Sequence, residues 1–372
     1  MIKTFKLYLT EAVGRQYQHI EDQIIINGSS GALAMLDDIS DVLSGEDKVT
    51  TKWDGNVAIY WGRDKNGNFI LLPQYQWKKK TITSLPELEQ DIINTGRKSD
   101  LDDEKTFKAK RQELANNYKK LWPIFEKATS ETLRGIYFKG DILFDTPPAK
   151  EKSGDYTFTP NKVTYHVRPD GLGNKISSAE VMVVVHGSVN KLGDDTIDDI
   201  DAKFVDALNN SPNLIVIGPT PITINPVNIP LLAKTKSFIS SNRVKIDYIS
   251  NFANNIKQAL YSYSIALGKD GSVKFDDWLE SSGVSEKAKT MFSELQIDHE
   301  DQWNTFWAAY NLIQQLKSVV LKELLNKDRD YNSLGVRSTT GNKPGGEGFV
   351  TSKLNKLINP EFRSSASNER FN

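Results

Sequence analysis

Lys52-Trp53-Asp54-Gly55 is the stretch that most constrains this 372-residue chain. It follows a β-branched run, Val49-Thr50-Thr51, which predicts a strand that ends at the lysine. Aspartate is typical of tight turns, and glycine lets the backbone approach a neighbouring group closely. A lysine amine becomes a nucleophile when burial, nearby cations or a metal lower its pKa. The stretch therefore predicts an amine presented at a strand end, where a nucleotide could bind.

The composition predicts a chain with a substantial hydrophobic core. Hydrophobic residues make up 38% of it, including seven Trp, thirteen Tyr and sixteen Phe. No apolar run approaches the roughly eighteen residues that would span a bilayer, and residues 1–7 predict a first strand or helix, not a signal peptide. The chain has no cysteine, which excludes disulfides, cysteine zinc sites and cysteine nucleophiles. We expect a cytoplasmic protein with no membrane partner.

Charge is balanced over the chain as a whole. There are 47 Lys and Arg and 48 Asp and Glu, a net charge of −1, so nucleic-acid binding would need a local basic surface. Residues 78–80 and 97–120 are the candidates, and the alternative interpretation of each is a solvated helix or loop. The four histidines show no ligand spacing of the His-x-x-x-His type, which does not favour a histidine zinc site.

Strand patterns dominate the first half of the chain. Ser29 and Ser30 can cap a helix that runs to about Leu43, where Gly45 stops it. Two helices broken near Gly96 are predicted over 85–125. The strand patterns cover residues 48–51, 56–61, 69–72, 136–144, 156–167 and 180–186. The last of these is apolar on both faces, which predicts a central strand.

The second half is mostly helical. Helices are predicted over 244–267 and 302–325. The second carries apolar residues every three or four positions, which predicts core packing and not a cofactor site: Trp303, Phe306, Tyr310, Ile313, Leu316, Val320 and Leu324. Residues 215–227 fit an edge strand or an extended linker. An exposed loop is predicted over 331–346, and strand character returns at 348–350 and 356–358.

These patterns predict an α+β fold with an interrupted core. The core would comprise residues 1–190 and 335–372, with antiparallel sheets and helices, and a mainly helical insertion would occupy residues 191–334.

Four motifs, taken in order, resemble those of covalent nucleotidyltransferases, the superfamily of ATP-dependent DNA ligases, RNA ligases and mRNA capping enzymes. They are Lys52-Trp53-Asp54-Gly55, Lys139-Gly140-Asp141-Ile142-Leu143-Phe144, Glu347-Gly348-Phe349-Val350 and Lys356-Leu357-Ile358-Asn359. More narrowly, the segment 156–165, the Leu172-Gly173 step and the strand ending in His186 resemble an uncharacterised ligase-like family of tailed bacteriophages. The resemblance implies an ATP-grasp-like adenylation core, and the host cytoplasm as location.

The resemblance also implies a role for each motif residue. Lys52 would attack the α-phosphate of ATP and form a lysyl-AMP phosphoramidate. Asp54, Gly55 and Asp141 would bind the nucleotide, with Asp141 on the ribose or on Mg²⁺. Glu347 would be the other magnesium ligand. Lys356 would contact the α-phosphate, with Lys353 as its rival. Magnesium keeps several waters, so one or two carboxylates suffice.

The chain departs from the family pattern in three places. Val57 stands where the pattern K-x-D-G-x-R has arginine, and Arg63 is the candidate to replace it. The connection between Glu347 and Lys356 is short. After Lys356 there is no room for the oligonucleotide-binding barrel that DNA ligases carry, so the helical segment is the candidate platform.

The predicted function is therefore ATP-dependent ligation of nucleic-acid ends, with RNA favoured slightly over DNA. Tyr75, Trp77 and Lys78–Lys80 could stack on and neutralise a strand, or could belong to an ordinary strand with exposed lysines. The first alternative is a catalytically degenerate phage accessory protein that binds nucleotide or nucleic acid. The second is a metal-dependent nuclease built on Asp141. Asp54 and His186 also have structural interpretations, as a turn anchor and as a hydrogen-bonded strand residue.

Overall fold

The computed structural model describes residues 18–78, 82–95, 103–194, 197–222, 224–252, 254–269, 272–328, 333–341, 343–353, 355–359 and 362. The fold is α+β, and most of its strand pairs are antiparallel. The chain divides into two compact units. The sheet unit contains Trp53–Thr220 and Arg329–Gly346, and the helical unit contains Gln16–Lys52, Pro221–Asp328 and Glu347–Asn372.

This division differs from the predicted boundaries at 190 and 335. The strand ending at Lys52 and the strands after Glu347 belong to the helical unit, and residues 197–220 belong to the sheet unit. The reason is packing. Val49, Phe349 and Leu357 lie in one hydrophobic core with the helices, whereas Leu214 and Val216 lie in the core of the large sheet.

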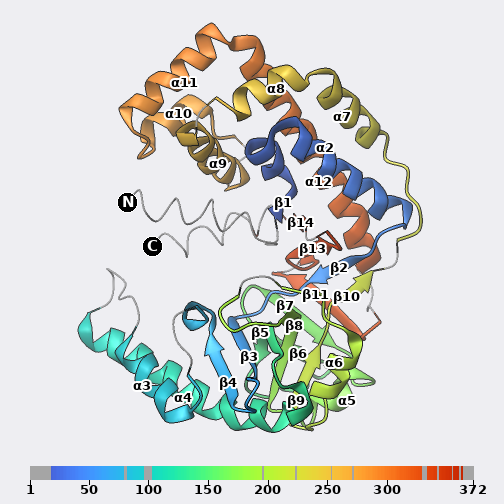
Figure 1. Ribbon diagram of the computed structural model, residues 1–372. Helices are drawn as coiled ribbons and strands as arrows, with labels where there is room; N and C mark the ends of the chain where they lie inside the picture. Colours follow the sequence, from blue (N-terminus) through green and yellow to red (C-terminus); the bar gives the residue numbers. More distant parts are fainter. Residues whose placement is uncertain are drawn as a thin grey trace. The chain divides into compact units, whose positions relative to one another are not determined.

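A five-stranded sheet forms the centre of the sheet unit (Figure 1). Its strands, in spatial order, are β4 (Phe69–Pro73), β3 (Val57–Arg63), β5 (Tyr137–Phe144), β8 (Val181–Val189) and β9 (Leu214–Ile217). Neighbours are antiparallel except β8 and β9, which are parallel. Val181–Val185 are all buried, which confirms the prediction of a central strand, and β9 is an edge strand.

Two helices contribute to the core of this sheet, α3 (Leu85–Asn94) and α4 (Glu104–Ala128). The Asp103 side chain caps α4 by accepting a hydrogen bond from the Thr106 amide. Tyr118, Leu121 and Phe125 then face the sheet, where Trp61 packs edge-on against Phe125. The remaining short helices are η3 (Gln74–Gln76), η4 (Glu131–Leu133), α5 (Leu172–Ile176) and α6 (Ala202–Leu208).

A second, four-stranded sheet completes this unit. Its order is β12 (Lys343–Pro344), β11 (Val336–Thr340), β7 (Val163–Val167) and β6 (Tyr156–Phe158), all antiparallel. The prediction of an exposed loop over 331–346 was wrong for β11. The polar sequence of β11 led to the loop prediction. The segment is a strand because its five residues pair with β7, from Val336 opposite Val167 to Thr340 opposite Val163.

The helical unit combines seven helices of the described chain with a five-stranded sheet. The helices are α2 (Gln23–Ser44), α7 (Pro230–Ser241), α8 (Arg243–Ser250), α9 (Asn254–Lys269), α10 (Phe275–Ser281), α11 (Glu286–Asp298) and α12 (Glu300–Asp328), with the short η2 (Ile20–Asp22) before α2. The strands, in spatial order, are β1 (Gln18–His19), β14 (Asn355–Ile358), β13 (Gly348–Thr351), β2 (Val49–Lys52) and β10 (Thr220–Ile222).

In this unit the core packing predicted for residues 302–325 and the helix end predicted at Gly45 are confirmed. The helix predicted over 244–267 is instead two helices, α8 and α9, and α2 begins at Gln23, before the predicted cap at Ser29 and Ser30. The seven apolar residues of α12 are all buried, and α8 packs against both α2 and α12 (Figure 1). Helix α2 ends at Gly45, whose φ of 78° is left-handed and suits glycine. Gly28 interrupts α2 with φ 62°, and Asp247 then accepts hydrogen bonds from the Ser29 amide and hydroxyl.

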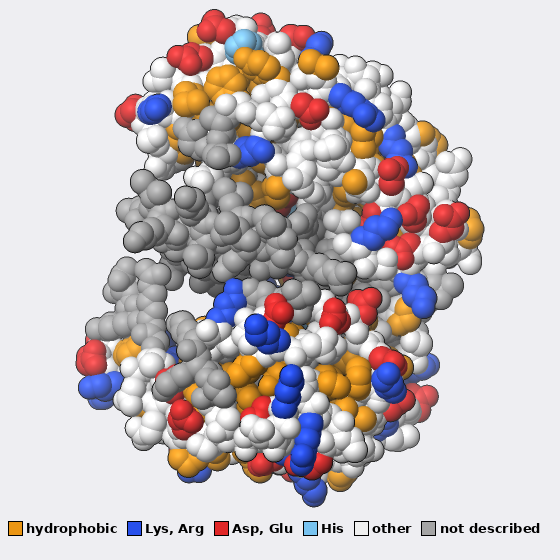
Figure 2. Space-filling model, viewed as in Figure 1, with side chains coloured by type: hydrophobic (Ala, Val, Ile, Leu, Met, Phe, Trp, Pro, Cys, Tyr) orange, Lys and Arg blue, Asp and Glu red, His pale blue; other side chains and the backbone are white. Residues whose placement is uncertain are grey.

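The surface of the described residues is polar and mixed in charge. None of the helices in the described part of the chain is both long enough and apolar enough to cross a membrane. On the face drawn in Figure 2, Lys and Arg side chains stand among Asp and Glu side chains, as expected from the net charge of −1.

A buried ion pair ties the start of the helical unit to its longest helix. Lys317 Nζ of α12 lies 2.6 Å from Glu21 Oε1, and the two side chains are 1% and 0% exposed. Removing one partner of such a pair leaves the other charge buried, which costs far more than the pair itself contributes.

We expect Lys317→Met to lower the free energy of unfolding by about 3–5 kcal/mol. Lys322→Met, on an exposed position of the same helix, should change it by less than about 0.5 kcal/mol. Urea unfolding of both variants measures the difference, and the double variant Glu21→Gln/Lys317→Met should recover much of the loss. Equal stability of the two single variants would show that the pair is not a buried electrostatic contact.

Candidate functional site

Lys52 and Glu347 meet at one end of the helical unit's sheet. Strand β2 pairs antiparallel with β13, and Lys52 lies opposite Gly348. This register brings the Lys52 amine against the carboxylate of Glu347, the residue just before β13, in a hydrogen-bonded ion pair. The side chains are 21% and 18% exposed. Two of the four motifs, 295 positions apart, therefore form one contact.

The two faces of this sheet differ: one packs on the helical core, and the other carries Lys52 and Lys356. Side chains alternate along a strand, and residues paired across neighbouring strands share a face. Val49, Phe349 and Leu357 point into the helical core. Lys52 therefore points to the other face, together with Lys356 of β14, which pairs with Val350. The two lysines lie on strands separated by β13 and are offset by two residues along the strands, so their Cα atoms are roughly 12 Å apart.

The close packing of β13 against β14 explains why the third motif has a glycine at position 348. The φ of Gly348 is 151°, and a Cβ built there would lie 2.2 Å from the carbonyl oxygen of Leu357. No larger residue fits without moving β14. The glycine is therefore required for the close contact of the two strands that carry Glu347 and Lys356.

Lys353 is engaged elsewhere in the helical unit. Its ammonium lies 2.7 Å from Asp41 Oδ2 and 3.8 Å from Asp38 Oδ1, both on α2. The hydrogen bond to Asp41, with smaller contributions from Asp38 and Asp47, raises the pKa of Lys353. The structure does not bring this lysine to Lys52 and Glu347. Lys353 instead helps to hold the β13–β14 turn on α2, where Asp38 also accepts hydrogen bonds from Thr351 and Asn355.

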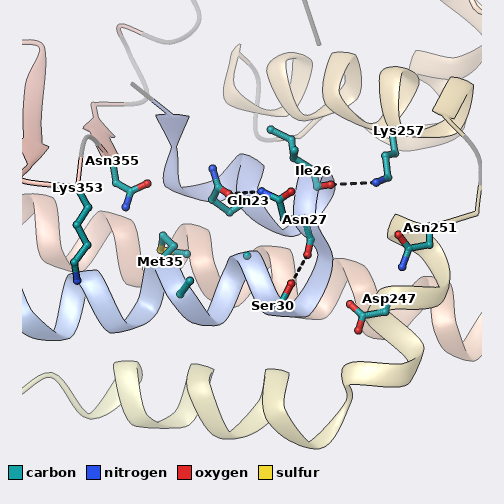
Figure 3. A pocket seen from close by; sticks show the side chains of 12 residues that line it. Gln23, Ile26, Asn27, Ser30, Met35, Asp247, Asn251, Lys257, Lys353 and Asn355 are labelled. Carbon is teal, nitrogen blue, oxygen red and sulfur yellow. Dashed lines mark hydrogen bonds between the residues drawn. The ribbon is translucent and has the colours of Figure 1, made fainter. Parts of the chain in front are cut away.

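A polar pocket of about 750 Å³ lies beside that turn (Figure 3). Its basic side chains, Lys257 and Lys353, are both engaged. Lys257 donates to the carbonyl of Ile26, at 3.1 Å, and Lys353 is paired with Asp41. Around them the lining consists largely of amides and hydroxyls. Since both ammonium groups already have partners, this pocket is a poor match for a triphosphate.

In the sheet unit, Asp54 anchors a turn. Its carboxylate is buried and accepts hydrogen bonds from the Asn161 side chain (3.0 Å) and from the amides of Lys162 (2.8 Å) and Val163 (2.9 Å). Its own amide donates to the Tyr165 hydroxyl at 2.6 Å. These contacts use the carboxylate to fix the loop before β7. They support the structural interpretation of Asp54 over a direct nucleotide contact.

Gly55 and Asp141 are packed against each other. A Cβ built on Gly55 would lie 2.3 Å from Asp141 Cβ, so only glycine allows this approach. Asp141 lies opposite Ala58 of β3 and Val184 of β8, and its Oδ2 is 2.8 Å from Nε2 of His186. The Asp141 and His186 side chains are 23% and 19% exposed. The first two motifs thus converge through the glycine and the aspartate.

His186 reaches Asp141 through an irregularity in the strand pairing. Lys139 pairs with Gly187 and Gly140 with Val185, so His186 is an extra residue opposite one step of β5. Such bulges redirect side chains, and they are frequent next to functional sites. The sequence suggested a hydrogen-bonded strand residue at His186, but nothing local to it signals a bulge or its partner.

Arg63 lies at the far end of β3 from the Asp54-Gly55 turn. Its guanidinium donates to the carbonyls of Thr129, Gly67 and Glu126, and it also pairs with Glu131 at 3.1 Å. It thereby ties the β3–β4 turn to the end of α4. Arg63 therefore does not replace the arginine that the family pattern has at position 57. The two residues are at opposite ends of β3, roughly 20 Å apart.

The proposed strand-binding cluster is divided between core and surface. Trp77 is 2% exposed and stacks on Tyr60, with ring centroids 4.2 Å apart, so it belongs to the core. Tyr75 is 39% exposed and its hydroxyl accepts a hydrogen bond from Arg111. Lys79 and Lys80 lie outside the described residues.

The two carboxylates predicted to hold magnesium, Glu347 and Asp141, have different partners. Among the residues that the structure describes, no group of three or more His, Asp or Glu side chains could enclose a metal ion. Glu347 pairs with Lys52 in the helical unit, and Asp141 pairs with His186 in the sheet unit.

Comparison with known protein families finds one family that matches the chain. The model of a family of unknown function (DUF6267) matches residues 16–73 and 98–270, more than half of the sequence. The chain belongs to this family. The matched residues include Lys52–Gly55, Asp141 and His186, whereas Glu347 and Lys356 lie beyond the match. No curated protein and no solved structure matches the chain.

We expect Gly55→Ala to lower the free energy of unfolding by about 1–3 kcal/mol, because the new methyl group overlaps Asp141. Gly283→Ala is the matched control, since a Cβ there meets no atom within 4 Å. Thermal or urea unfolding of the two variants measures the effect. If both variants unfold alike, the contact between the first two motifs is looser than described.

Proposed function

We propose that this protein is an ATP-dependent nucleotidyltransferase of the polynucleotide-ligase type, which becomes covalently adenylylated on Lys52. The observation that carries the proposal is the pairing of Lys52 with Glu347 on adjacent strands. An amine that is one-fifth exposed and held by a carboxylate at a strand end suits a nucleophile that must meet a ligand from solvent.

The first reaction would form one bond and break one. Lys52 Nζ attacks the α-phosphorus of ATP, and an N–P bond forms as the bond to the bridging oxygen breaks. Pyrophosphate leaves with the electron pair. The ammonium must lose one proton before it can attack, and the Glu347 carboxylate, its hydrogen-bond partner, can accept that proton. A second proton leaves the nitrogen to solvent once the N–P bond has formed. Lys356, on the same face of the sheet, is the proposed contact for the α-phosphate.

Glu347 would hold Mg²⁺ beside Lys52, in the helical unit. Carboxylate oxygens suit this ion, which retains several waters and needs one or two protein ligands. When bound, it would neutralise charge on the phosphates. In the sheet unit, the hydrogen bond from His186 would orient the Asp141 carboxylate for the ribose or metal contact that the resemblance implies.

The next steps would join nucleic-acid ends. AMP would pass from Lys52 to a 5′-phosphate, forming a phosphoanhydride and regenerating the amine. A 3′-hydroxyl would then attack that phosphate and release AMP. RNA ends are proposed slightly ahead of DNA ends, on the resemblance alone.

One observation favours the second candidate function, a non-catalytic relative that binds nucleotide or nucleic acid. Val57 stands in the arginine position of the motif, and Arg63 is fully engaged at the other end of β3. Loss of a phosphate-binding cation is expected in a degenerate enzyme. Covalent labelling separates the two functions.

We expect incubation with α-³²P-ATP and magnesium to label the wild-type protein in a form that survives denaturation. Phosphoramidates are acid-labile, so acid treatment should release the label. Lys52→Ala should remove it, because no amine remains at the attacking position. Lys48→Ala, at an exposed position just before the same strand, should keep it. A wild-type protein that never takes up label would rule out the enzyme and favour the second candidate.

We expect Glu347→Gln to slow labelling by about 100-fold or more, because the amide keeps the shape but can neither accept a proton nor carry charge. Glu46→Gln, an exposed change in the same unit, is the control. Labelling time courses measure the rates, and unfolding curves check that both variants are folded. An undiminished rate in Glu347→Gln would remove this carboxylate from the chemistry.

A further inference from the structure

A second, smaller pocket lies in the sheet unit, at the end of β5. It encloses about 210 Å³ between α4, the end of β5 and residues 158–160. Ile142 lines it and belongs to the core beneath α4. Neither Asp141 nor His186 belongs to the lining of this pocket.

The pocket has an apolar, partly aromatic lining. Phe144 and Phe158 both line it, and their rings meet edge to face with centroids 5.3 Å apart. Leu121 and Val57 add aliphatic surface. The volume is below the roughly 300 Å³ at which pockets for drug-sized molecules begin, so the pocket suits a single flat ring system and not a whole nucleotide.

Two carboxamides lie at this pocket. Asn56, which directly follows the first motif, and Asn117 of α4 both line it and are exposed. Among the residues that the structure describes, neither side chain has a hydrogen-bond partner in the protein. A carboxamide offers a donor and an acceptor side by side, the combination that reads the edge of a nucleobase.

Basic side chains lie next to the pocket on α4. Lys120 donates a hydrogen bond to the carbonyl of Asp145, a residue of the pocket lining. Lys119 is 66% exposed beside it, with Glu89 3.8 Å away. Lys105 and Lys108 of α4 are exposed as well, and Lys108 pairs with Glu104 at 3.3 Å. Together with Lys119 and Lys120 they form a lysine stripe along the helix.

We propose that this pocket binds one unpaired nucleobase of a single-stranded nucleic acid, whose phosphates follow the lysine stripe of α4. The aromatic lining would contact the base, Asn56 and Asn117 would hydrogen-bond to its edge, and Lys119 and Lys120 would neutralise the backbone. This inference rests on the proposed function in one respect, since it names where the strand to be joined is held.

The test measures binding without ATP, so that it is independent of adenylylation. Fluorescence anisotropy of a short labelled single-stranded oligonucleotide gives the Kd for wild type, Asn117→Ala and Asn116→Ala. Asn116 is the control, because it neighbours Asn117 on α4 but bonds to Gln112 and does not line the pocket. We expect Asn117→Ala to weaken binding by about tenfold and Asn116→Ala to leave it unchanged. Lys120→Ala should reduce the slope of log Kd against log salt concentration by about one, because one phosphate contact is lost.

Three results would overturn the inference. The first is equal Kd values for Asn117→Ala and Asn116→Ala. The second is equal affinity for a duplex of the same sequence, whose bases are not available to a pocket. The third is saturable binding of free adenosine, lost in Asn117→Ala, without binding of the oligonucleotide, which would make the pocket a nucleoside site. Binding is measured without ATP, so a failure of labelling and a failure of this inference are distinguishable.

Discussion

The pairing of β2 with β13 is the interaction on which the candidate site depends. It joins the strand that ends in Lys52 to a strand that begins almost 300 residues later. Backbone hydrogen bonds set the register, and Gly348 permits the close approach of β14 on the other side. One face of the resulting sheet is buried against helices, so a register slip by one residue would move Lys52 into the core. Hydrophobic burial thus fixes where the amine points.

In the sheet unit, too, hydrogen bonds and close packing fix the positions of the motif residues. Asp54 uses its carboxylate to hold the loop before β7, and Gly55 lets Asp141 approach the turn. Asp141 is then held by His186 across a bulge. The motif that begins at Lys52 therefore serves both units, with its lysine in one and its turn in the other. Packing and hydrogen bonds account for Asp54 and Gly55 of this motif.

Several cations in the described part of the chain already have partners inside their own unit, which makes them poor candidates for ligand binding. Lys353, Lys257 and Arg63 have carboxylate or carbonyl partners that account for their positions. The buried pair of Lys317 and Glu21 is structural. In contrast, the Lys52–Glu347 pair is partly exposed, and its carboxylate belongs to a glycine-rich segment and not to a packed helix. Such a pair can be opened by a ligand at lower cost than a buried one.

The sequence by itself determined the features that depend on neighbours along the chain. The apolar period of α12, the end of α2 at Gly45 and the central position of β8 follow from local pattern and turn chemistry. It also indicated that Lys52 and Glu347 belong together, through a resemblance and not through a physical argument. Only the tertiary structure decided the unit boundary at Lys52, the strand at β11 and the partners of Arg63, Lys353 and Trp77. Those depend on which distant segments pack and pair, and long-range pairing leaves no periodic trace in the sequence.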